Sequence, residues 1–462
     1  MQSIIFKIYS NSPVFFQNLV VSLYGLYWKF RRFGGVFKKE VDLFRSRNGF
    51  SKHQWYEYQE TELRKLLVHA FTKVPFYKKK YTDAGFSIED FKTFKLSDLN
   101  KLPFLEKDEL RQFCRTELLS NERAKGNFYS SSGSTGTPTS IYYSNRFHQT
   151  WSAAFEVRIR EWAGIDRFTA RGMIGGRKIS QVNTPPFYRY NCFEKQTYFS
   201  AYHISQNNIK NYLEGIIRGK VKYMTGYAMS NYLLAVEFEK AGIVPPKMKA
   251  VITSSEKLTD KMRKTLERVY DCKVFDSYSG VEACGLISES NDHNLYISPD
   301  VGIVEVLNEK ENPVQENEMG ELISTGLLNY DQPLIRYKIG DRISLKKIND
   351  NKNYIQMPAV KSIEGRIEDV VTGPNGNSMV RFHGVFVDID GLIAGQTVQE
   401  TISHIILILV IDNHYYSKQK SEIVMSNRIK FQLGNSIKVS FEYVDELPKT
   451  SAGKIKAVIT KI

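Results

Sequence analysis

One short stretch rich in serine, threonine and glycine constrains this chain more than any other. It reads Tyr129-Ser-Ser-Ser-Gly-Ser-Thr-Gly-Thr-Pro-Thr-Ser140. Gly133 and Gly136 permit positive φ angles, so the backbone there can approach a ligand closely. Backbone N–H groups and short hydroxyl side chains are neutral donors that can surround a polyphosphate. The residues that we expect to form such a phosphate loop are Ser131, Ser132, Gly133, Ser134, Thr135, Gly136 and Thr137.

A flexible linker between domains is the alternative interpretation of this stretch. However, Ile141-Tyr-Tyr143 follows closely, and its β-branched and aromatic residues predict a strand. Pro138 fixes a turn just before that strand. This strand-like context favours the phosphate loop over the linker. It is not a Walker loop, because no Gly-Lys-Ser/Thr follows at the required spacing.

The composition excludes several classes of protein. The 462 residues suffice for two or three domains and a large core, and 42% hydrophobic content argues against bulk disorder. Four cysteines without CxxC spacing argue against a disulfide framework and a zinc ribbon. They indicate a reducing compartment, and we expect a cytoplasmic protein.

The formal net charge of +14 suits nucleic acid, an anionic membrane surface or an anionic nucleotide as a partner. The basic residues are spread along the chain and no nucleic-acid motif is present, so we predict no nucleic-acid partner.

The N-terminal region is where a membrane could be involved. Residues 14–28 are mostly apolar, and Lys29, Arg31 and Arg32 follow them. The run is too short and too interrupted by polar residues to span a bilayer, and it lacks the features of a signal peptide. Two interpretations stay open: a helix packed on the body, or an interfacial helix beside anionic headgroups. The second implies peripheral contact with the inner face of the membrane.

The order of predicted elements indicates an α/β fold. Residues 1–120 read as a helical part, and strands alternate with helices from 172 to 282. This alternation predicts mostly parallel sheets with flanking helices. Ligands bind at the carboxyl ends of such strands, where the phosphate loop would meet two further groups. These groups are Ser254, Ser255 and Glu256, and Tyr278 to Glu282.

The sequence predicts an N-terminal domain, 1–365, and a C-terminal domain, 366–462. A small β unit completes the first domain, and a small α+β unit forms the second. Residues 299–347 read as a small antiparallel sheet or barrel, and the C-terminal part reads as a small α+β domain with a hairpin at Asn375-Gly376. Asp341 is either a turn-former after glycine or a carboxylate that accepts from ribose hydroxyls. His203 either packs in the core or lines an acyl pocket.

Together these stretches resemble the adenylate-forming superfamily of acyl–coenzyme A synthetases, luciferases and adenylation domains. The likeness is greatest to its phenylacetate–coenzyme A ligase-like branch and the CapK members, often found with surface-polysaccharide genes. It spans essentially the whole chain. The motifs that carry it are Ser131-Ser-Gly-Ser-Thr-Gly-Thr-Pro138, Tyr278-Ser-Gly-Val-Glu282, Pro333-Leu-Ile-Arg-Tyr-Lys-Ile-Gly-Asp341, Gly365-Arg-Ile-Glu-Asp369 and Pro448-Lys-Thr-Ser-Ala-Gly-Lys454.

The resemblance implies a reaction in two steps. A small carboxylic acid attacks the α-phosphate of ATP, and a nucleophile such as coenzyme A then displaces AMP from the acyl-adenylate. It also implies that Ser131–Thr137 hold the β- and γ-phosphates and that Glu282 binds Mg²⁺. Ser254, Ser255, Glu256 and Tyr278 would border the adenine. The acyl pocket would be lined from His203, Tyr227 and Gly280.

The C-terminal lysine of the family matches Lys454, whose ammonium group would offset charge at the α-phosphate in the transition state. A solvated surface lysine is the plain alternative. Asp341 would accept from the ribose hydroxyls, and Arg366 would hold ribose or phosphate. The small domain would act as a mobile lid that delivers Lys454, hinged at Arg366–Asp369.

Three departures from the family pattern matter. Thr137 stands where many relatives carry a lysine, which removes a charge beside the leaving pyrophosphate. Ser279 replaces a frequent glycine. Cys284 and His293 are too few to hold the structural zinc of some relatives, so we predict none.

Four hypotheses for the function follow. The first is an AMP-forming ligase that makes an acyl–coenzyme A, and the second transfers the acyl group to an amine or hydroxyl of a sugar nucleotide or glycan. The third is a non-catalytic nucleotide-binding scaffold, against which the presence of Glu282 and Lys454 argues. The fourth, nucleic-acid binding, has only the net charge behind it.

Overall fold

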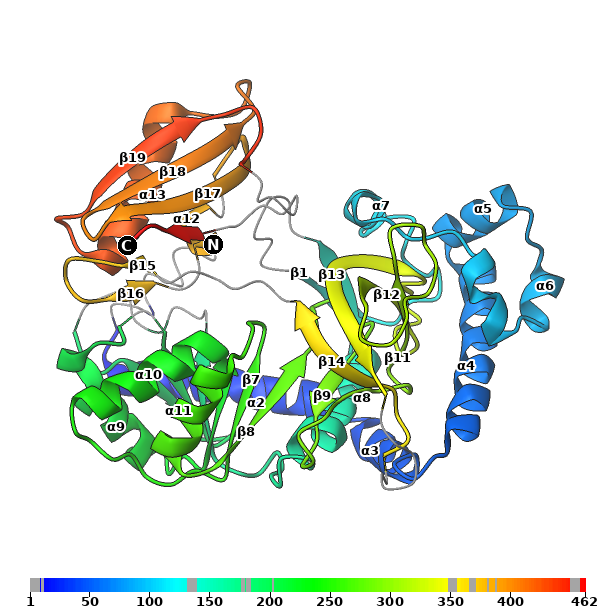
Figure 1. The fold of residues 1–462 in the computed structure, drawn as a ribbon, viewed down its shortest axis with the longest axis horizontal. Helices are drawn as coiled ribbons and strands as arrows, with labels where there is room; N and C mark the ends of the chain where they lie inside the picture. Colours follow the sequence, from blue (N-terminus) through cyan, green and yellow to red (C-terminus); the bar gives the residue numbers. More distant parts are fainter. Residues whose placement is uncertain are drawn as a thin grey trace.

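The structure is a computed structural model. It describes residues 9, 12–130, 139–175, 179, 184–201, 203–347, 355–364, 371–379, 382–386, 389–448 and 458–462. A large α/β unit occupies the lower part of Figure 1, and a smaller unit, coloured orange to red, contains the C-terminus.

The centre of the large unit is a parallel sheet, as the alternation of strands and helices predicted. Its five parallel strands lie in the order β5 (Gln196–Ser200), β3 (Arg171–Gly175), β6 (Tyr223–Tyr227), β7 (Ala250–Ser254) and β8 (Lys273–Tyr278). Gly226 of β6 has a φ of +128°, and a Cβ atom there would lie 1.9 Å from the carbonyl oxygen of Ile174. Only glycine therefore permits this close approach at the end of the strand.

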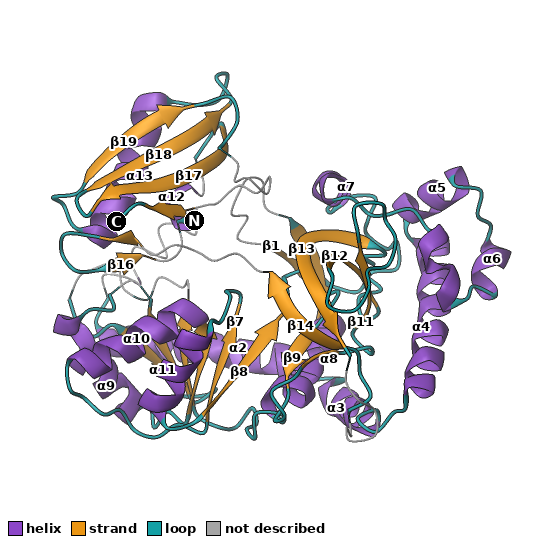
Figure 2. Ribbon diagram, viewed as in Figure 1, coloured by secondary structure: helices purple, strands orange, loops and turns teal. Residues whose placement is uncertain are grey.

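Among the described residues, antiparallel strands extend the sheet on both sides to twelve strands. Figure 2 shows in orange the strands that follow β8 on one of these sides. β4 (Tyr188–Asn191) pairs with β5 at one edge. On the other side follow β9 (Ile287–Glu289), β10 (Leu295–Ile297), β14 (Ala359–Glu364), β13 (Tyr337–Lys346), β12 (Met319–Gly326) and β11 (Gly302–Leu307). The region 299–347, expected as a small antiparallel sheet or barrel, is thus the antiparallel end of the large sheet.

Helices cover both faces of the parallel strands. α9 (Ile209–Arg218), α10 (Ala228–Lys240) and α11 (Asp260–Tyr270) pack on the face that presents Ile174, Met224 and Val251. The opposite face presents Tyr223 and Ile252 to the layer of α2 (Val14–Phe33), α3 (Phe37–Ser46) and α8 (Asn145–Phe155). Alternate residues of each strand therefore face two different helical layers.

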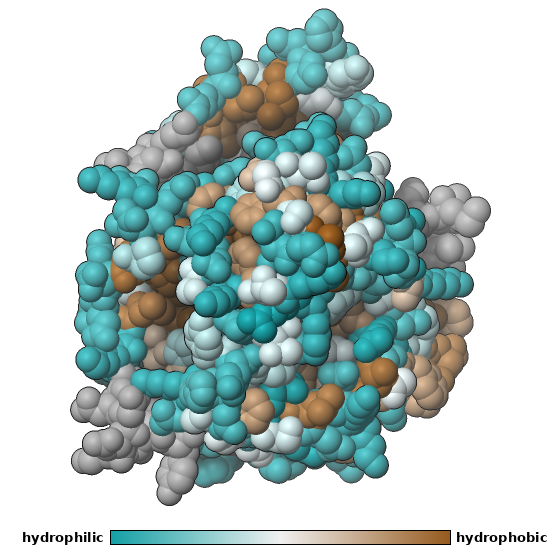
Figure 3. Space-filling model, turned by 90° about the vertical axis from the view of Figure 1, so that its right-hand side faces the viewer, coloured by the Kyte–Doolittle hydropathy of each residue, from teal (hydrophilic) through white to brown (hydrophobic). Residues whose placement is uncertain are grey.

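The predicted helical part contains α2, α3, α4 (Lys52–Lys73), α5 (Pro75–Asp83), α6 (Ile88–Lys92), a 3-10 helix (Leu96–Lys101) and α7 (Lys107–Phe113). α4 begins at a capping box of Ser51 and Gln54 and buries Leu63, Leu66, Leu67 and Ala70, which share one helical face. The end of the molecule formed by α4 to α6 has a mostly hydrophilic surface (Figure 3). Among the described residues, no helix is long and apolar enough to cross a membrane.

The C-terminal unit is the α+β domain that the sequence predicted. Its sheet has the order β19 (Lys438–Tyr443), β18 (His404–Ile411), β17 (Leu392–Thr401) and β20 (Val458–Thr460). The predicted hairpin at Asn375-Gly376 joins β15 (Val371–Thr372) to β16 (Ser378–Met379). Leu407 and Leu409 of β18 pack against Met425 and Ile429 of α13 (Lys418–Leu433), and a short helix, α12 (His383–Phe386), lies beside it.

Candidate active site

The predicted phosphate loop joins two paired strands. β1 (Gly126–Ser130) and β2 (Ser140–Ser144) are antiparallel, with Ser130 opposite Ser140, so the strand predicted after the loop is present. The loop residues Ser131, Ser132, Gly133, Ser134, Thr135, Gly136 and Thr137 lie outside the described residues. Thr139, at the base of the loop, donates a hydrogen bond of 3.3 Å to Oε1 of Glu282. The loop therefore ends beside Glu282, for which the family resemblance implies a role in binding Mg²⁺.

Glu282 lies in a largely apolar place after the carboxyl end of β8. The Tyr143 hydroxyl donates to the carbonyl oxygen of Val281 at 2.7 Å, which fixes this turn against β2. Burial raises the pKa of the Glu282 carboxyl, and the nearby Asp341 carboxylate acts in the same direction. A nearby cation would favour the ionised form of this half-buried carboxyl group. A carboxyl group in such a setting is suited to bind a metal ion.

Asp341 and Tyr278 come together although 63 residues separate them. The Tyr278 hydroxyl donates to Oδ2 of Asp341 at 2.7 Å. Asp341 lies within β13, where the register shifts between β12 and β13, and not in the turn that sequence reasoning allowed. Its carboxylate is thus held at the carboxyl end of β8, where the resemblance expected ribose and adenine contacts.

The group Ser254 to Glu256 leaves the end of β7 in a tight turn. Ser255 has a φ of +68°, which is uncommon for a residue with a side chain. Glu256 then accepts a 2.8 Å hydrogen bond from the backbone N–H of Met229, in the first turn of α10. Glu256 thus has a structural role at the helix start, and its place beside adenine stays a prediction.

A cavity of about 390 Å³ opens beside these residues, on the face of the sheet toward α2 and α8. Ser254, Ser277 and Val281 line one part of it, and the aromatic side chains of Trp28, Tyr129, Trp151 and Tyr198 line others. Enclosed pockets with apolar walls and a few polar groups are typical of small-molecule sites. Among the described residues, this cavity lies next to the candidate site.

None of the predicted acyl-pocket residues His203, Tyr227 and Gly280 is among the residues that line this cavity. His203 lies on the opposite face of the sheet, where its ring stacks on Phe187 with centroids 4.5 Å apart. Its Nδ1 pairs with Ser200 Oγ at 2.7 Å, and burial lowers its pKa to about 4. His203 is therefore a neutral, packed histidine, which was the other interpretation of its sequence position.

Sequence reasoning missed most of the residues that line the cavity. Arg32, Arg160 and Arg171 contribute to it from three different elements. Such residues carry no local motif, because only the tertiary packing of helices against the sheet brings them together. The regular helix α8 continues into a π-helical turn, Glu156–Arg160, which carries Arg160.

Two predicted catalytic residues, Arg366 and Lys454, lie outside the described residues, so their roles stay predictions. Within the described ranges, no group of three or more His, Cys, Asp or Glu side chains is placed to hold a metal ion.

Comparison with known proteins gives one consistent result. Residues 371–461 match the family described as the CapK C-terminal domain. Protein CapK of Staphylococcus aureus is 28% identical, over 98% of this chain and 99% of its own length. Phenylacetate-coenzyme A ligase of Thermus thermophilus is 22% identical, over 87% of this chain and 95% of its own.

A solved structure has the same fold. A 2-hydroxyisobutyryl-CoA ligase, crystallised with 2-HIB-AMP and CoA in the thioesterification state, superposes with a TM-score of 0.59 at 16% identity. The superposition covers 90% of this chain and 92% of that one.

Proposed function

The chain belongs to the adenylate-forming superfamily, as an AMP-forming acid–coenzyme A ligase-like enzyme of the branch with CapK and the phenylacetate–coenzyme A ligases, and we propose its reaction on that premise. It activates a small carboxylic acid with ATP and transfers the acyl group to a thiol, coenzyme A. The observation that carries this proposal is the contact of Thr139 with Glu282 beside the cavity. It brings the base of the phosphate loop, the candidate metal ligand and a substrate-sized pocket to one edge of the sheet.

The chemistry would proceed as follows. A carboxylate oxygen of the acid attacks the α-phosphorus, the bond to the bridging oxygen of the β-phosphate breaks, and pyrophosphate leaves. The thiolate of the acceptor then attacks the acyl carbon, and AMP leaves with the oxygen that joined it to the acyl group. Asp341, held by Tyr278, would accept from the ribose hydroxyls. Mg²⁺ bound at Glu282 would neutralise phosphate charge.

The residues outside the described ranges complete this proposal. Ser131 to Thr137 would donate to the β- and γ-phosphates, Arg366 would hold ribose or phosphate, and Lys454 would lie between the carboxylate and the α-phosphate. Phosphoryl transfer of this kind depends on positioning and charge neutralisation. Movement of the C-terminal unit would deliver Lys454 for the first step and withdraw it for the second.

The acceptor in the second step separates the two leading hypotheses. Similarity to Protein CapK extends over essentially the full length of both chains. The alternative to coenzyme A, an amine or hydroxyl of a sugar nucleotide or glycan, rests only on the resemblance to CapK members found with surface-polysaccharide genes. We would measure AMP release with a panel of acids, adding coenzyme A or an amino-sugar nucleotide in turn. Faster AMP release with coenzyme A supports a thiol acceptor. Faster AMP release with the amino-sugar nucleotide alone would make the sugar nucleotide the acceptor in place of coenzyme A. ATP binding with no AMP release under any condition would support a scaffold.

Peripheral contact with an anionic membrane is a lesser part of the proposal. Helix α2 turns polar residues inward, with Gln17 accepting from Arg189 at 2.6 Å and Ser22 buried, and it contains no acidic residue. Apart from Lys29, its exposed side chains are apolar or aromatic, and they are Phe15, Phe16, Leu19, Leu23, Tyr24, Tyr27 and Phe30. An apolar helical face with lysines beside it suits an anionic lipid surface.

We expect the protein to sediment with anionic lipid vesicles and to do so less when Phe15 and Phe30, 74% and 68% exposed, are both replaced by serine. The control is Val244→Ser, which removes an exposed apolar side chain from another surface. Equal sedimentation of all three proteins, or none with any vesicle, would contradict membrane contact through α2.

A further inference from the structure

The cavity beside the candidate site runs along the strands of the sheet. At one end it is lined by Arg171 and Tyr223, which are paired in register at the starts of β3 and β6. At the other end it is lined by Ser254 and Ser277, paired at the carboxyl ends of β7 and β8. The two levels are four residues apart along the strands, or about 13 Å at 3.3 Å per residue. An acid whose reacting carboxyl lies near Glu282 would extend its other end toward Arg171.

The far end of this cavity is cationic. Arg32 reaches it from the end of α2, Arg160 from the π-helical turn and Arg171 from the start of β3. Among the described residues, the lining holds these three arginines and no aspartate or glutamate. Burying guanidinium groups is costly, and three of them would not be needed to bind a neutral acyl chain.

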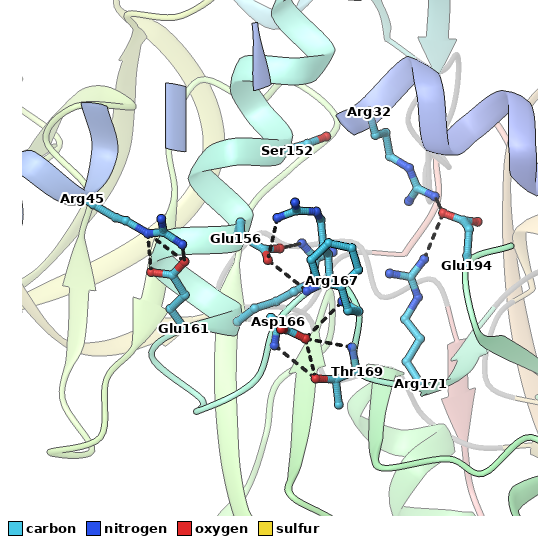
Figure 4. A network of polar contacts seen from close by, with 12 residues as sticks. Arg32, Arg45, Ser152, Glu156, Glu161, Asp166, Arg167, Thr169, Arg171 and Glu194 are labelled. Carbon is cyan, nitrogen blue, oxygen red and sulfur yellow. Dashed lines mark hydrogen bonds and ion pairs between the residues drawn. The ribbon is translucent and has the colours of Figure 1, made fainter. Parts of the chain in front are cut away.

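One buried carboxylate, Glu194, lies behind this end and is shared by two of the arginines (Figure 4). Arg32 and Arg171 approach Oε1 of Glu194 from opposite sides, and Arg171 Nη2 lies 3.4 Å from it. The side chains of Arg171 and Glu194 are 6% and 3% exposed. Arg171 also donates from Nε to Oε1 of Gln196 at 2.7 Å. A neutral amide oxygen, and not a carboxylate, therefore accepts one of its hydrogen bonds.

A second buried carboxylate, Glu156, is shared in the same way. Arg160 Nη1 lies 2.8 Å from Oε2 of Glu156, and Arg167 Nη1 lies 3.6 Å from Oε1. Among the described residues, four guanidinium groups therefore share two carboxylates, a formal surplus of two positive charges. Arg167, which carries part of that surplus, is 29% exposed and does not line the cavity. Buried ions are stable when each is paired, so a shared carboxylate leaves part of this charge to be balanced by something else.

The ionisation of Arg32 agrees with this imbalance. Burial lowers the pKa of Arg32 to about 10, and although Glu194 acts in the opposite direction, Arg171 and Arg160 lower it further. Arg171 and Arg160 therefore repel Arg32 across the cavity, and an anion placed among them would relieve that repulsion. Burial acts against the charge of Arg160 as well, but Tyr223 and Glu156 outweigh it and raise the pKa of Arg160.

We infer that the cavity selects a carboxylic acid with a second carboxylate, bound by Arg171, Arg32 and Arg160 at the end away from the reacting carboxyl. The inference rests on the proposed function and specifies its substrate class as a dicarboxylic acid. Planar guanidinium groups bind carboxylates through paired hydrogen bonds, which explains arginine at this end. The aromatic walls between the two ends would pack against the chain that joins the two carboxylates.

The test compares diacids with monoacids of equal chain length, for example adipate with hexanoate and suberate with octanoate. Binding to the full-length protein is measured by calorimetry without ATP, and pyrophosphate exchange is measured in parallel. We expect the diacid to bind at least about tenfold more tightly, the worth of one charge-assisted hydrogen bond. In Arg171→Gln that preference should fall by a similar factor, and Arg32→Gln gives the same test at a less buried position.

Glu194→Gln is the matched variant with the opposite expectation. It removes the carboxylate that competes for Arg32 and Arg171, so the preference for the diacid should rise, whereas a damaged cavity would lower the binding of both acids. Equal binding of diacid and monoacid, or no binding of either, would overturn the inference. Diacid preference in binding with no exchange for any acid would overturn the proposed reaction and leave the inference standing. Exchange with monoacids alone would overturn the inference and leave the proposed reaction standing.

Discussion

Replacing Glu282 with glutamine is expected to slow acid-dependent pyrophosphate exchange by about 100-fold or more, because it removes the carboxylate that would hold Mg²⁺ against the phosphates. The shape of the side chain is preserved, and Thr139 keeps a carbonyl oxygen to which it can donate. Since burial raises the pKa of Glu282, the ionised form is disfavoured in the fold, and a neutral amide should not lower the free energy of unfolding.

The control for this variant is Glu321→Gln. Glu321 is a half-buried carboxylate in β12 whose pKa is also raised by burial, and it lies outside the candidate site. Both variants should unfold at similar urea concentrations, and only Glu282→Gln should lose exchange. A Glu282→Gln protein that exchanges pyrophosphate within about threefold of the wild type would exclude the metal-binding role.

Replacing Asp300 with alanine is expected to lower the free energy of unfolding by about 3–5 kcal/mol, because it leaves two buried guanidinium groups without their counter-ion. Oδ2 of Asp300 lies 2.8 Å from Arg158 Nη2 and 3.0 Å from Arg47 Nε. The side chains of Arg158 and Asp300 are fully buried. This group joins the residue after α3 to the π-helical turn that carries Arg160 into the cavity, so the variant should also weaken acid binding.

An exposed ion pair between the same two elements provides the control. Arg45 Nη2 lies 2.6 Å from Oε1 of Glu161, with side chains 50% and 29% exposed (Figure 4). Glu161→Ala should cost no more than about 1 kcal/mol, because water screens such pairs. Urea-induced unfolding measures both variants. If Asp300→Ala cost no more than Glu161→Ala, the buried group would not hold the turn in place.

The sequence predicted the large pattern of the fold because that pattern rests on periodicity. The parallel strands β6, β7 and β8 are apolar runs bounded by turns, and they lie within residues 172–282, where strands were predicted to alternate with helices. β17 was missed because its buried positions include Gln396, Thr397 and Gln399, which carry no apolar alternation. Tertiary burial of polar side chains in this strand gives the sequence no signal to follow.

The candidate site was predictable where it consists of motifs and unpredictable where it depends on register. Tyr278, Asp341 and Glu282 were each marked by a short motif, and the structure brings them to one edge of the sheet. The cationic end of the cavity was not marked by any motif. Arg171 and Arg160 come together there only through the pairing of β3 with its neighbours and through the π-helical turn. His203 was marked by aromatic neighbours, yet those neighbours place it in the core of the opposite face.

The most direct test of the proposed reaction is acid-dependent exchange of pyrophosphate into ATP, with Lys454→Ala beside the wild type. Lys438→Ala is the control, since Lys438 is an exposed lysine of the same domain. Exchange should appear with one class of acid, persist in Lys438→Ala and fall by about 100-fold or more in Lys454→Ala. ATP binding without exchange for any monoacid or diacid, or exchange equal in the two variants, would contradict adenylation through Lys454.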